Sequence, residues 1–348
     1  MKLYKQIIFI LIVFFKTETL FSENSLFAVN NIEIEKKDKI TNNALADKAI
    51  KKGFDQLITK ILLKDDINKL SDLQFSSIKQ LVTYYQITNI TEEKKSEEFV
   101  NFSVTFDKNK MHSLFFKKEI SYSEILDKEL YILPILIEED EIFTFSNNYF
   151  YENWNKVFEE DLLEFILPIE NIEILQHINK NKNNLINLEV DDLFQEYPNK
   201  NLAIILIEKN KSNNKKVYIK AKIQKKNIFK SLKFKKQDFK SEKSNQKIIV
   251  ELKKELINII KSENLIDIRT PSFLNVKLDL NKRSSLVILN SKIKNIESIE
   301  NVYVKNFTKD SMNLRIKYLG KLDKLINQLK KEKIDLKLIN DQWFIKTL

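Results

Sequence analysis

Few residues in this chain are of a type that could carry catalysis or bind a metal. The sequence has no cysteine and two histidines, His112 and His177. Without cysteine, thiolate metal sites, disulfides and a cysteine nucleophile are all excluded. Neither histidine has a second donor at helical or hairpin spacing, so we expect each to be a surface or half-buried residue. We therefore predict no metal and no cofactor.

Acidic runs leave one enzymatic alternative open. They lie at residues 138–141, 159–161 and 191–192 of a chain that is 31% charged. Two carboxylates that line one cleft can hydrolyse a glycosidic bond, although acidic runs are more often solvated turns and helix starts. Trp154 could stack on a sugar, but a buried aromatic core explains it better, and we expect Trp343 to be a packing anchor. We name no catalytic residue and keep a carbohydrate-active hydrolase as an alternative.

Other catalytic motifs are absent from the sequence. The chain contains two glycines, which is too few for a glycine-rich loop around a phosphate. It also lacks a Gly-x-Ser-x-Gly elbow, so no serine nucleophile can be recognised. The sequence predicts no reaction.

One segment of the chain is strongly basic. Residues 209–247 hold 15 lysines against Asp238 and Glu242, a local net charge of +13, while the whole chain has +10. Apolar residues alternate with lysines here, which predicts two adjacent strands with lysines on the outer face. Such a face could bind anionic lipid headgroups, an acidic polysaccharide or an acidic protein. The predicted binding residues are Lys220, Lys222, Lys225, Lys226, Lys233 and Lys235.

The same lysines have a simpler explanation. Only Arg269, Arg283 and Arg315 are arginines among the 59 basic residues, and isoleucine and asparagine are also abundant. This bias is typical of AT-rich coding sequences, which use lysine by default. Lysines on an exposed face can serve solubility alone, and the composition favours that explanation.

The first residues predict export. Lys2 and Lys5 precede an unbroken apolar run at 7–15, and a polar stretch follows as far as Ser22. This order is typical of a secretory signal peptide. Nine residues of helix span about 14 Å, less than the roughly 30 Å of a bilayer core. We predict a signal peptide at 1–22, cleaved after Ser22 or near Ala28, and a periplasmic mature chain without a transmembrane helix. Export argues against a nucleic-acid partner.

Apolar periodicity predicts an α+β protein built of several small units with antiparallel sheets. The first unit, 27–125, has the order βααββα, with strands at 27–35, 85–91 and 98–107 and helices at 41–63, 73–85 and 108–118. The second, 129–262, carries the lysine-rich strands. Its strands are predicted at 130–137, 202–207, 217–223 and 228–234 and its helices at 190–197 and 247–260.

The third unit, 270–348, has the clearest pattern. Strands are expected at 275–280, 302–307 and 312–318, helices at 284–299 and 322–329, and a final pair of strands at 334–339 and 343–345. The order βαββαβ is that of the ferredoxin-like fold, in which two helices cover one face of an antiparallel sheet.

Five stretches of the sequence resemble the family known as domain of unknown function 2066, which is found in exported bacterial envelope proteins. They are residues 44–62, 81–86, 102–114, 130–137 ahead of Trp154, and 192–206. The resemblance implies an envelope protein without an assigned activity. Its motifs are packing motifs, so no functional residue is carried over from the family.

These observations favour a non-catalytic binding or assembly factor of the cell envelope. Its expected partner is an envelope protein or an anionic envelope polymer. The alternatives are a binding module for anionic lipid or polysaccharide that uses the lysine-rich face, and the carbohydrate-active hydrolase described above.

Overall fold

The computed structural model describes a mixed α+β protein with 39% helix and 37% strand. The predicted signal segment, 1–22, lies outside the described residues. No helix within the described part of the chain is both long enough and apolar enough to cross a bilayer. The described residues are 26–36, 41–88, 99–125, 127–138, 141–157, 162–209, 214–235, 241–279, 284–296, 298–308 and 310–347.

The chain forms two compact units, and the first is built from both ends of the sequence. Residues 1–122 and 266–348 make up the first unit, and residues 123–265 make up the second. Ile266 and Leu319 are buried in the same core as the N-terminal residues, which joins the two ends. The stretches 27–125 and 270–348, expected as separate units, therefore both contribute to the first compact unit.

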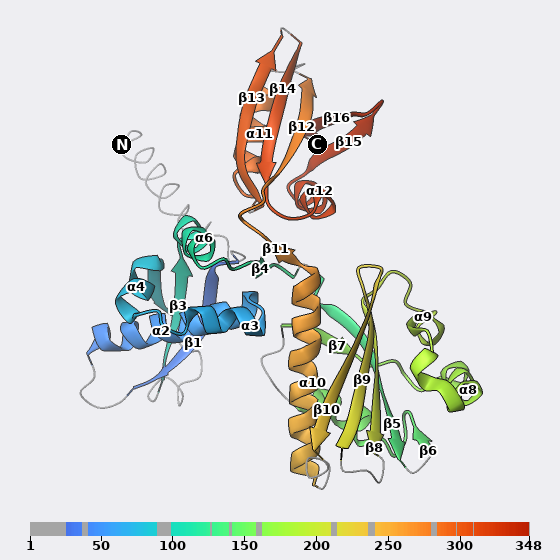
Figure 1. The fold of residues 1–348 in the computed structure, drawn as a ribbon. Coiled ribbons are helices and arrows are strands. Elements are labelled where there is room, and N and C mark those ends of the chain that lie inside the picture. The colour runs from blue at the N-terminus through green and yellow to red at the C-terminus, as the bar shows by residue number, and fades with distance from the viewer. Residues whose placement is uncertain are drawn as a thin grey trace, which may run out of the picture. The chain divides into compact units, whose positions relative to one another are not determined.

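The N-terminal part of the first unit packs helices on a three-stranded antiparallel sheet (Figure 1). The sheet order is β1 (Ala28–Glu35), β3 (Phe99–Phe106), β2 (Val82–Thr88). The helical segments are α2 (Asn42–Ile61), α3 (Lys64–Ile67), η2 (Asn68–Leu70), α4 (Phe75–Leu81) and α6 (Lys108–Lys117). Side chains cap two of them: the Thr41 hydroxyl accepts from the amide of Ala44, and Asp107 accepts from that of Lys110.

Most predicted elements of this part are confirmed, but one boundary was wrong. The helix expected at 73–85 ends at Leu81, and the strand begins at once with Val82. Tyr85 lies opposite Val104 and Ile87 opposite Phe102 in the sheet. Pairing with β3 therefore overrides the helical spacing of the preceding residues, because each paired residue gains backbone hydrogen bonds and apolar contacts.

The second unit is a sheet covered by helices on both faces. Its strands run in the order β10 (Lys226–Lys235), β9 (Asn214–Ile223), β8 (Leu202–Lys209), β5 (Glu129–Glu138), β6 (Glu141–Phe143), and β7 (Glu164–Ile166) pairs with β5. In β8, Leu202, Ile204 and Leu206 join one core while Ala203, Ile205 and Ile207 join the other. A strand buried on both faces explains its unbroken apolar run.

Each face of this sheet has its own helices. One core contains residues of α7 (Tyr149–Asn153), η3 (Trp154–Lys156) and α10 (Glu242–Glu263). The other contains residues of α8 (Ile172–Lys180), η4 (Lys182–Asn187) and α9 (Val190–Leu193). Trp154 has no exposed surface and packs edge-on against Phe165 with ring centroids 5.9 Å apart. It is a core residue, and its ring is not available to stack on a sugar.

The expectation of antiparallel sheets was wrong for three strand pairs. β5 pairs in parallel with β8 and with β7, and β12 (Ser272–Asp279) pairs in parallel with β16 (Gln342–Thr347). The chain between β5 and β8 contains the whole α7–α9 region, long enough for the crossover that a parallel pair requires.

The C-terminal part of the first unit is a five-stranded sheet with both of its helices on one face. It comprises β12, α11 (Ser284–Ile293), β13 (Ile299–Phe307), β14 (Ser311–Tyr318), α12 (Leu322–Lys331), β15 (Ile334–Ile339) and β16, in the sheet order β13-β14-β12-β16-β15. Asn340 and Asp341 both have positive φ, as in a tight hairpin turn. This turn brings β16 back beside β12, and Trp343 packs half-buried against the core as expected.

Two short strands complete the described topology. β4 (Tyr122–Ser123) and β11 (Leu265–Ile266) pair as a two-stranded sheet. They lie where the chain passes from residues 1–122 to 123–265 and where it returns to 266–348.

Candidate functional site

Two of the six predicted binding lysines, Lys220 and Lys222 of β9, bind to the helical segments that cover the sheet. Lys220 donates from its Nζ to the carbonyl oxygens of Ile186, at 3.0 Å, and Leu188, at 2.6 Å. The Nζ of Lys222 lies 2.5 Å from the Asp191 carboxylate. Both lysines therefore hold η4 and α9 against the sheet, and both side chains are half-buried. This explains why lysines stand on a face that helices partly cover.

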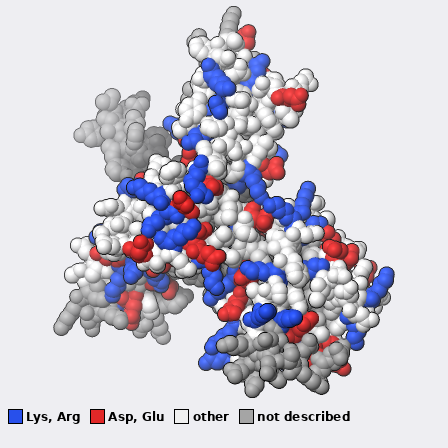
Figure 2. Space-filling view, viewed as in Figure 1, with Lys and Arg blue, Asp and Glu red and all other residues white. Residues whose placement is uncertain are grey.

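The other four predicted lysines do not form one patch. Lys226 pairs with Glu263 of α10 at 2.8 Å. Lys225 is exposed in the turn between β9 and β10. Lys233 is exposed on the face of β10 opposite to the buried Phe234. The side chain of Lys235 lies outside the described residues. The acidic partners of Lys222 and Lys226 lie in α9 and α10, more than 30 residues away from these lysines in the sequence, so the lysine-rich segment did not reveal them. In the view of Figure 2, basic and acidic side chains are interspersed.

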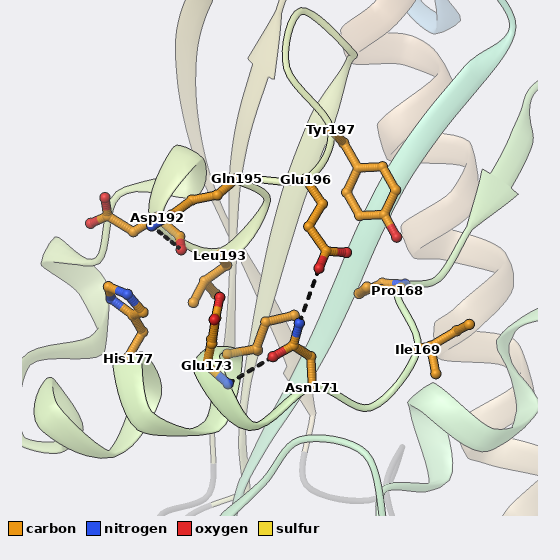
Figure 3. Close-up of a pocket in the computed structure, with 11 residues that line it drawn as sticks. Pro168, Ile169, Asn171, Glu173, His177, Asp192, Leu193, Gln195, Glu196 and Tyr197 are labelled. Carbon is orange, nitrogen blue, oxygen red and sulfur yellow. Dashed lines mark hydrogen bonds between the residues drawn. The ribbon is translucent and has the colours of Figure 1, made fainter.

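A small hollow lies between α8 and the segment after α9 (Figure 3). Asn171 caps α8 by accepting from the amide of Glu173 at 2.7 Å, and it donates to the Glu196 carboxylate at 3.3 Å. Figure 3 shows His177 and Asp192 at one end of the hollow and Glu196 at the other. Its volume of about 30 Å³ holds a few water molecules, which is too little for a sugar unit.

The geometry does not favour a hydrolase or a metal site in the described chain. Of the acidic pair at 191–192, Asp191 is bound to Lys222 and Asp192 borders the small hollow. The run at 159–161, like residues 139 and 140, lies outside the described residues. Within the described ranges, no three histidine or acidic side chains are grouped so that they could hold a metal ion.

His112 is buried, whereas His177 is half-buried as expected. The Nε2 of His112 lies 3.1 Å from the hydroxyl of Tyr122, and the Nδ1 of His112 lies 3.5 Å from the Glu300 carboxylate. Burial, helped by the charge of Lys108, lowers the pKa of His112 to about 4, although Glu300 acts in the opposite direction. The ring is neutral at pH 7 and serves packing, which corrects the expectation of a surface or half-buried residue.

On the outer face of the C-terminal sheet, cations without an ion-pair partner among the described residues lie on aromatic rings. Alternate residues of β12 and β14 face the core with α11 and α12, and the residues between them face outward. We call this surface the outer face. It is defined by Phe273, Lys277, Tyr303, Arg315 and Phe344.

On the outer face, aromatic rings hold the cations. The guanidinium carbon of Arg315 lies 4.1 Å from the ring centroid of Phe273, and the Nζ of Lys277 lies 5.8 Å from that of Phe344. Both distances are in the range of cation–π interactions. Tyr303 lies directly opposite Arg315 on β13 and is 47% exposed. Neither Arg315 nor Lys277 forms an ion pair with any described residue.

Two acidic residues near the outer face are paired with lysines, and a third, Asp279, is exposed two residues after Lys277 on β12. Glu300 pairs with Lys317 at 2.9 Å, and Asp335 pairs with Lys337 at 3.3 Å. Arg315, between the outward residues of β12 and β13, keeps its positive charge without an ion pair among the described residues. Sequence analysis missed this site because Arg315 and Phe273 are 42 residues apart, although the alternation of β12 and β14 marked both strands.

No family model, no curated protein and no solved structure matches this chain. The resemblance to the domain of unknown function 2066 therefore stays a hypothesis.

Proposed function

We propose that this chain is an exported, non-catalytic binding factor of the bacterial cell envelope, which recognises an anionic partner through the outer face of its C-terminal sheet. We also propose that this part is a variant of the ferredoxin-like plan, with β16 placed beside β12 and β15 at the edge. Export rests on the signal-like sequence at 1–22, and binding rests on the chemistry of the outer face.

The observation that carries this proposal is the environment of Arg315. The chain uses three arginines among 59 basic residues, and Arg269 contacts both carboxylate oxygens of Asp267 at 2.8 and 2.9 Å. Arg315 instead lies on Phe273 with no acidic partner, and its buried Nε has no hydrogen-bond partner among the described residues. A guanidinium fixed in this way is preorganised to bind a carboxylate or a phosphate. Its planar group can donate two parallel hydrogen bonds to such an anion.

Binding of the mature chain to immobilised polyanions tests this function. We expect binding to polygalacturonate and polyglutamate that weakens at high salt. Arg315→Gln should reduce the affinity about tenfold, because it removes a charge-assisted pair. Arg269→Gln is the matched control and should bind like the wild type.

The same assay separates the outer face from the lysine-rich strands. Lys225→Gln combined with Lys233→Gln removes the two predicted lysines that are exposed without a described partner. We expect that double variant to bind normally. The proposal is wrong if Arg315→Gln binds as tightly as the wild type, or if neither polymer binds at low salt.

Cell fractionation tests export. We expect the chain in the extracytoplasmic fraction, without residues 1–22. Recovery of the intact N-terminus in the cytoplasm would contradict the envelope location.

A further inference from the structure

We infer that the anionic partner is an acidic polysaccharide built of uronic acid units. This inference rests on the proposed function and specifies its ligand. The outer face combines three kinds of groups: the cations Arg315 and Lys277, the exposed ring of Tyr303, and the amide of Asn275. A uronic acid unit offers a partner for each of them.

Each group on the outer face matches one part of such a unit. A carboxylate fits the fork of Arg315 through two charge-assisted hydrogen bonds. The carbonyl and NH₂ of Asn275 can accept from and donate to neighbouring hydroxyls. Asn275 lies opposite Arg315 on β12, and Tyr303 lies opposite Arg315 on β13, so the three side chains form one row across three strands. The ring of Tyr303 can pack against the apolar face of the sugar.

The arrangement suits a polymer better than a single anion. Lys277 follows Asn275 by two residues on β12, and Phe344 lies opposite it on β16. Arg315 and Lys277 are diagonal neighbours on adjacent strands, a relation that places their backbones about 7–8 Å apart. Two cations at this spacing, on a sheet face without its own helix, can contact successive acidic units of one chain.

Single-stranded nucleic acid is the competing partner, because its bases stack on aromatic residues of open sheets. Here the rings of Phe273 and Phe344 each already have a cation over one face. Among the defining residues of the outer face, Tyr303 is the ring with no such cation. Successive stacking of bases is therefore disfavoured, and the predicted export of the chain argues in the same direction.

The test compares four polymers on the full mature chain: polygalacturonate, its fully methyl-esterified form, polyglutamate and oligo(dT). We expect polygalacturonate to bind most tightly and the uncharged ester to bind weakly. Tyr303→Ala should reduce the affinity for polygalacturonate about threefold to tenfold, which is the range of an aromatic contact. It should leave polyglutamate binding unchanged, since a polypeptide carboxylate has no sugar ring.

Two variants serve as controls in this assay. Tyr303→Phe keeps the ring and should bind polygalacturonate nearly as well as the wild type. Phe116→Ala removes an aromatic residue that is 60% exposed on α6, outside the C-terminal sheet, and should have no effect. The thermal midpoint of each variant shows whether it is folded.

The outcomes separate the polysaccharide assignment from the proposed binding of an anionic partner by the outer face. Equal affinity for polygalacturonate and polyglutamate, with no effect of Tyr303→Ala, would overturn the polysaccharide assignment but leave anion binding intact. Tighter binding of oligo(dT) than of polygalacturonate would also overturn it. Failure of all three anionic polymers to bind would reject the proposed function as well.

Discussion

His112 shows how a single buried residue can make the stability of this protein depend on pH. Its ring packs edge-on against Phe27 and stacks on Tyr122, so water is largely excluded. Burial lowers the pKa of the ring from 6.5 to about 4. The unfolded chain therefore binds a proton more readily than the folded chain at intermediate pH.

The pH dependence of stability follows from this difference. The contribution of His112 is fully present above pH 6.5 and is lost as the pH falls towards 4. Between pH 7.5 and 5 we expect a loss of about 2 kcal/mol. Hydrogen exchange of the β3 amides at both pH values measures this loss of unfolding free energy. His112→Gln, which keeps a group that can bond to Tyr122, should lose this part of the dependence. An unchanged pH dependence in that variant would contradict the assignment.

Lys220 tests whether the lysines of β9 are structural. Lys220→Met keeps the length of the side chain but leaves the carbonyls of Ile186 and Leu188 without their donor. We expect the free energy of unfolding to fall by about 0.5–1.5 kcal/mol, the net contribution of a hydrogen bond, because these bonds are exposed or partly buried. Lys225→Met, in an exposed turn, is the control and should change stability little. Urea unfolding compares the two, and equal effects would contradict a structural role for Lys220.

At the scale of elements, the position of α2 depends on a glycine. Gly53 faces the sheet, and a Cβ atom there would lie 2.7 Å from Cδ1 of the buried Ile32 and 3.6 Å from Cβ of Val104. The missing side chain lets the helix lie close to β1 and β3. A close approach thus explains a glycine in the middle of a helix, where it otherwise lowers stability.

Substitution of Gly53 tests this close packing. Gly53→Val should reduce the free energy of unfolding by about 1–3 kcal/mol, because the extra methyl groups overpack the contact with β1 and β3. Gly53→Ala should be tolerated better, since the end of the Ile32 side chain can move and alanine favours helix. Lys48→Val, on the exposed side of α2, controls for the helix propensity of valine. Equal thermal midpoints of Gly53→Val and Lys48→Val would contradict the explanation.

At the scale of the whole molecule, residues 123–265 carry complete hydrophobic cores of their own. Every residue of the two cores on either face of the second sheet lies between Ile125 and Ile260. A stretch with its own core can fold independently. In the first unit, the N-terminal core also includes Ile266 and Leu319 from the other end of the chain, while the C-terminal sheet has a core between Leu274 and Ile345.

Expression of residues 123–265 alone tests this division. We expect a soluble domain with a cooperative thermal transition and dispersed amide resonances. Trp154→Ala in the same fragment removes a fully buried ring and should lower its stability by about 3–5 kcal/mol. A wild-type fragment without a cooperative transition would show that the second unit depends on the rest of the chain.

The sequence alone determined the elements whose apolar spacing is local. The period of α2, the alternation of β9 and β14 and the apolar run of β8 each depend on residues a few positions apart, and each predicted the right element. The sequence also located the lysine-rich strands and excluded cysteine chemistry. The spacing of apolar residues along a short segment shows which side chains share one face, and this is enough to predict a helix or a strand.

Only the tertiary structure decided which distant residues meet. The parallel pairing of β5 with β8 and of β12 with β16, the carbonyl partners of Lys220 and the stacking of Arg315 on Phe273 join residues separated by more than 30 positions. Local spacing carries no record of these contacts, because strand order and side-chain partners are set by the packing of whole elements. For this reason the charge run pointed to lysines of which the fold uses Lys220, Lys222 and Lys226 internally, while Arg315 and Lys277 lie on aromatic rings of another sheet.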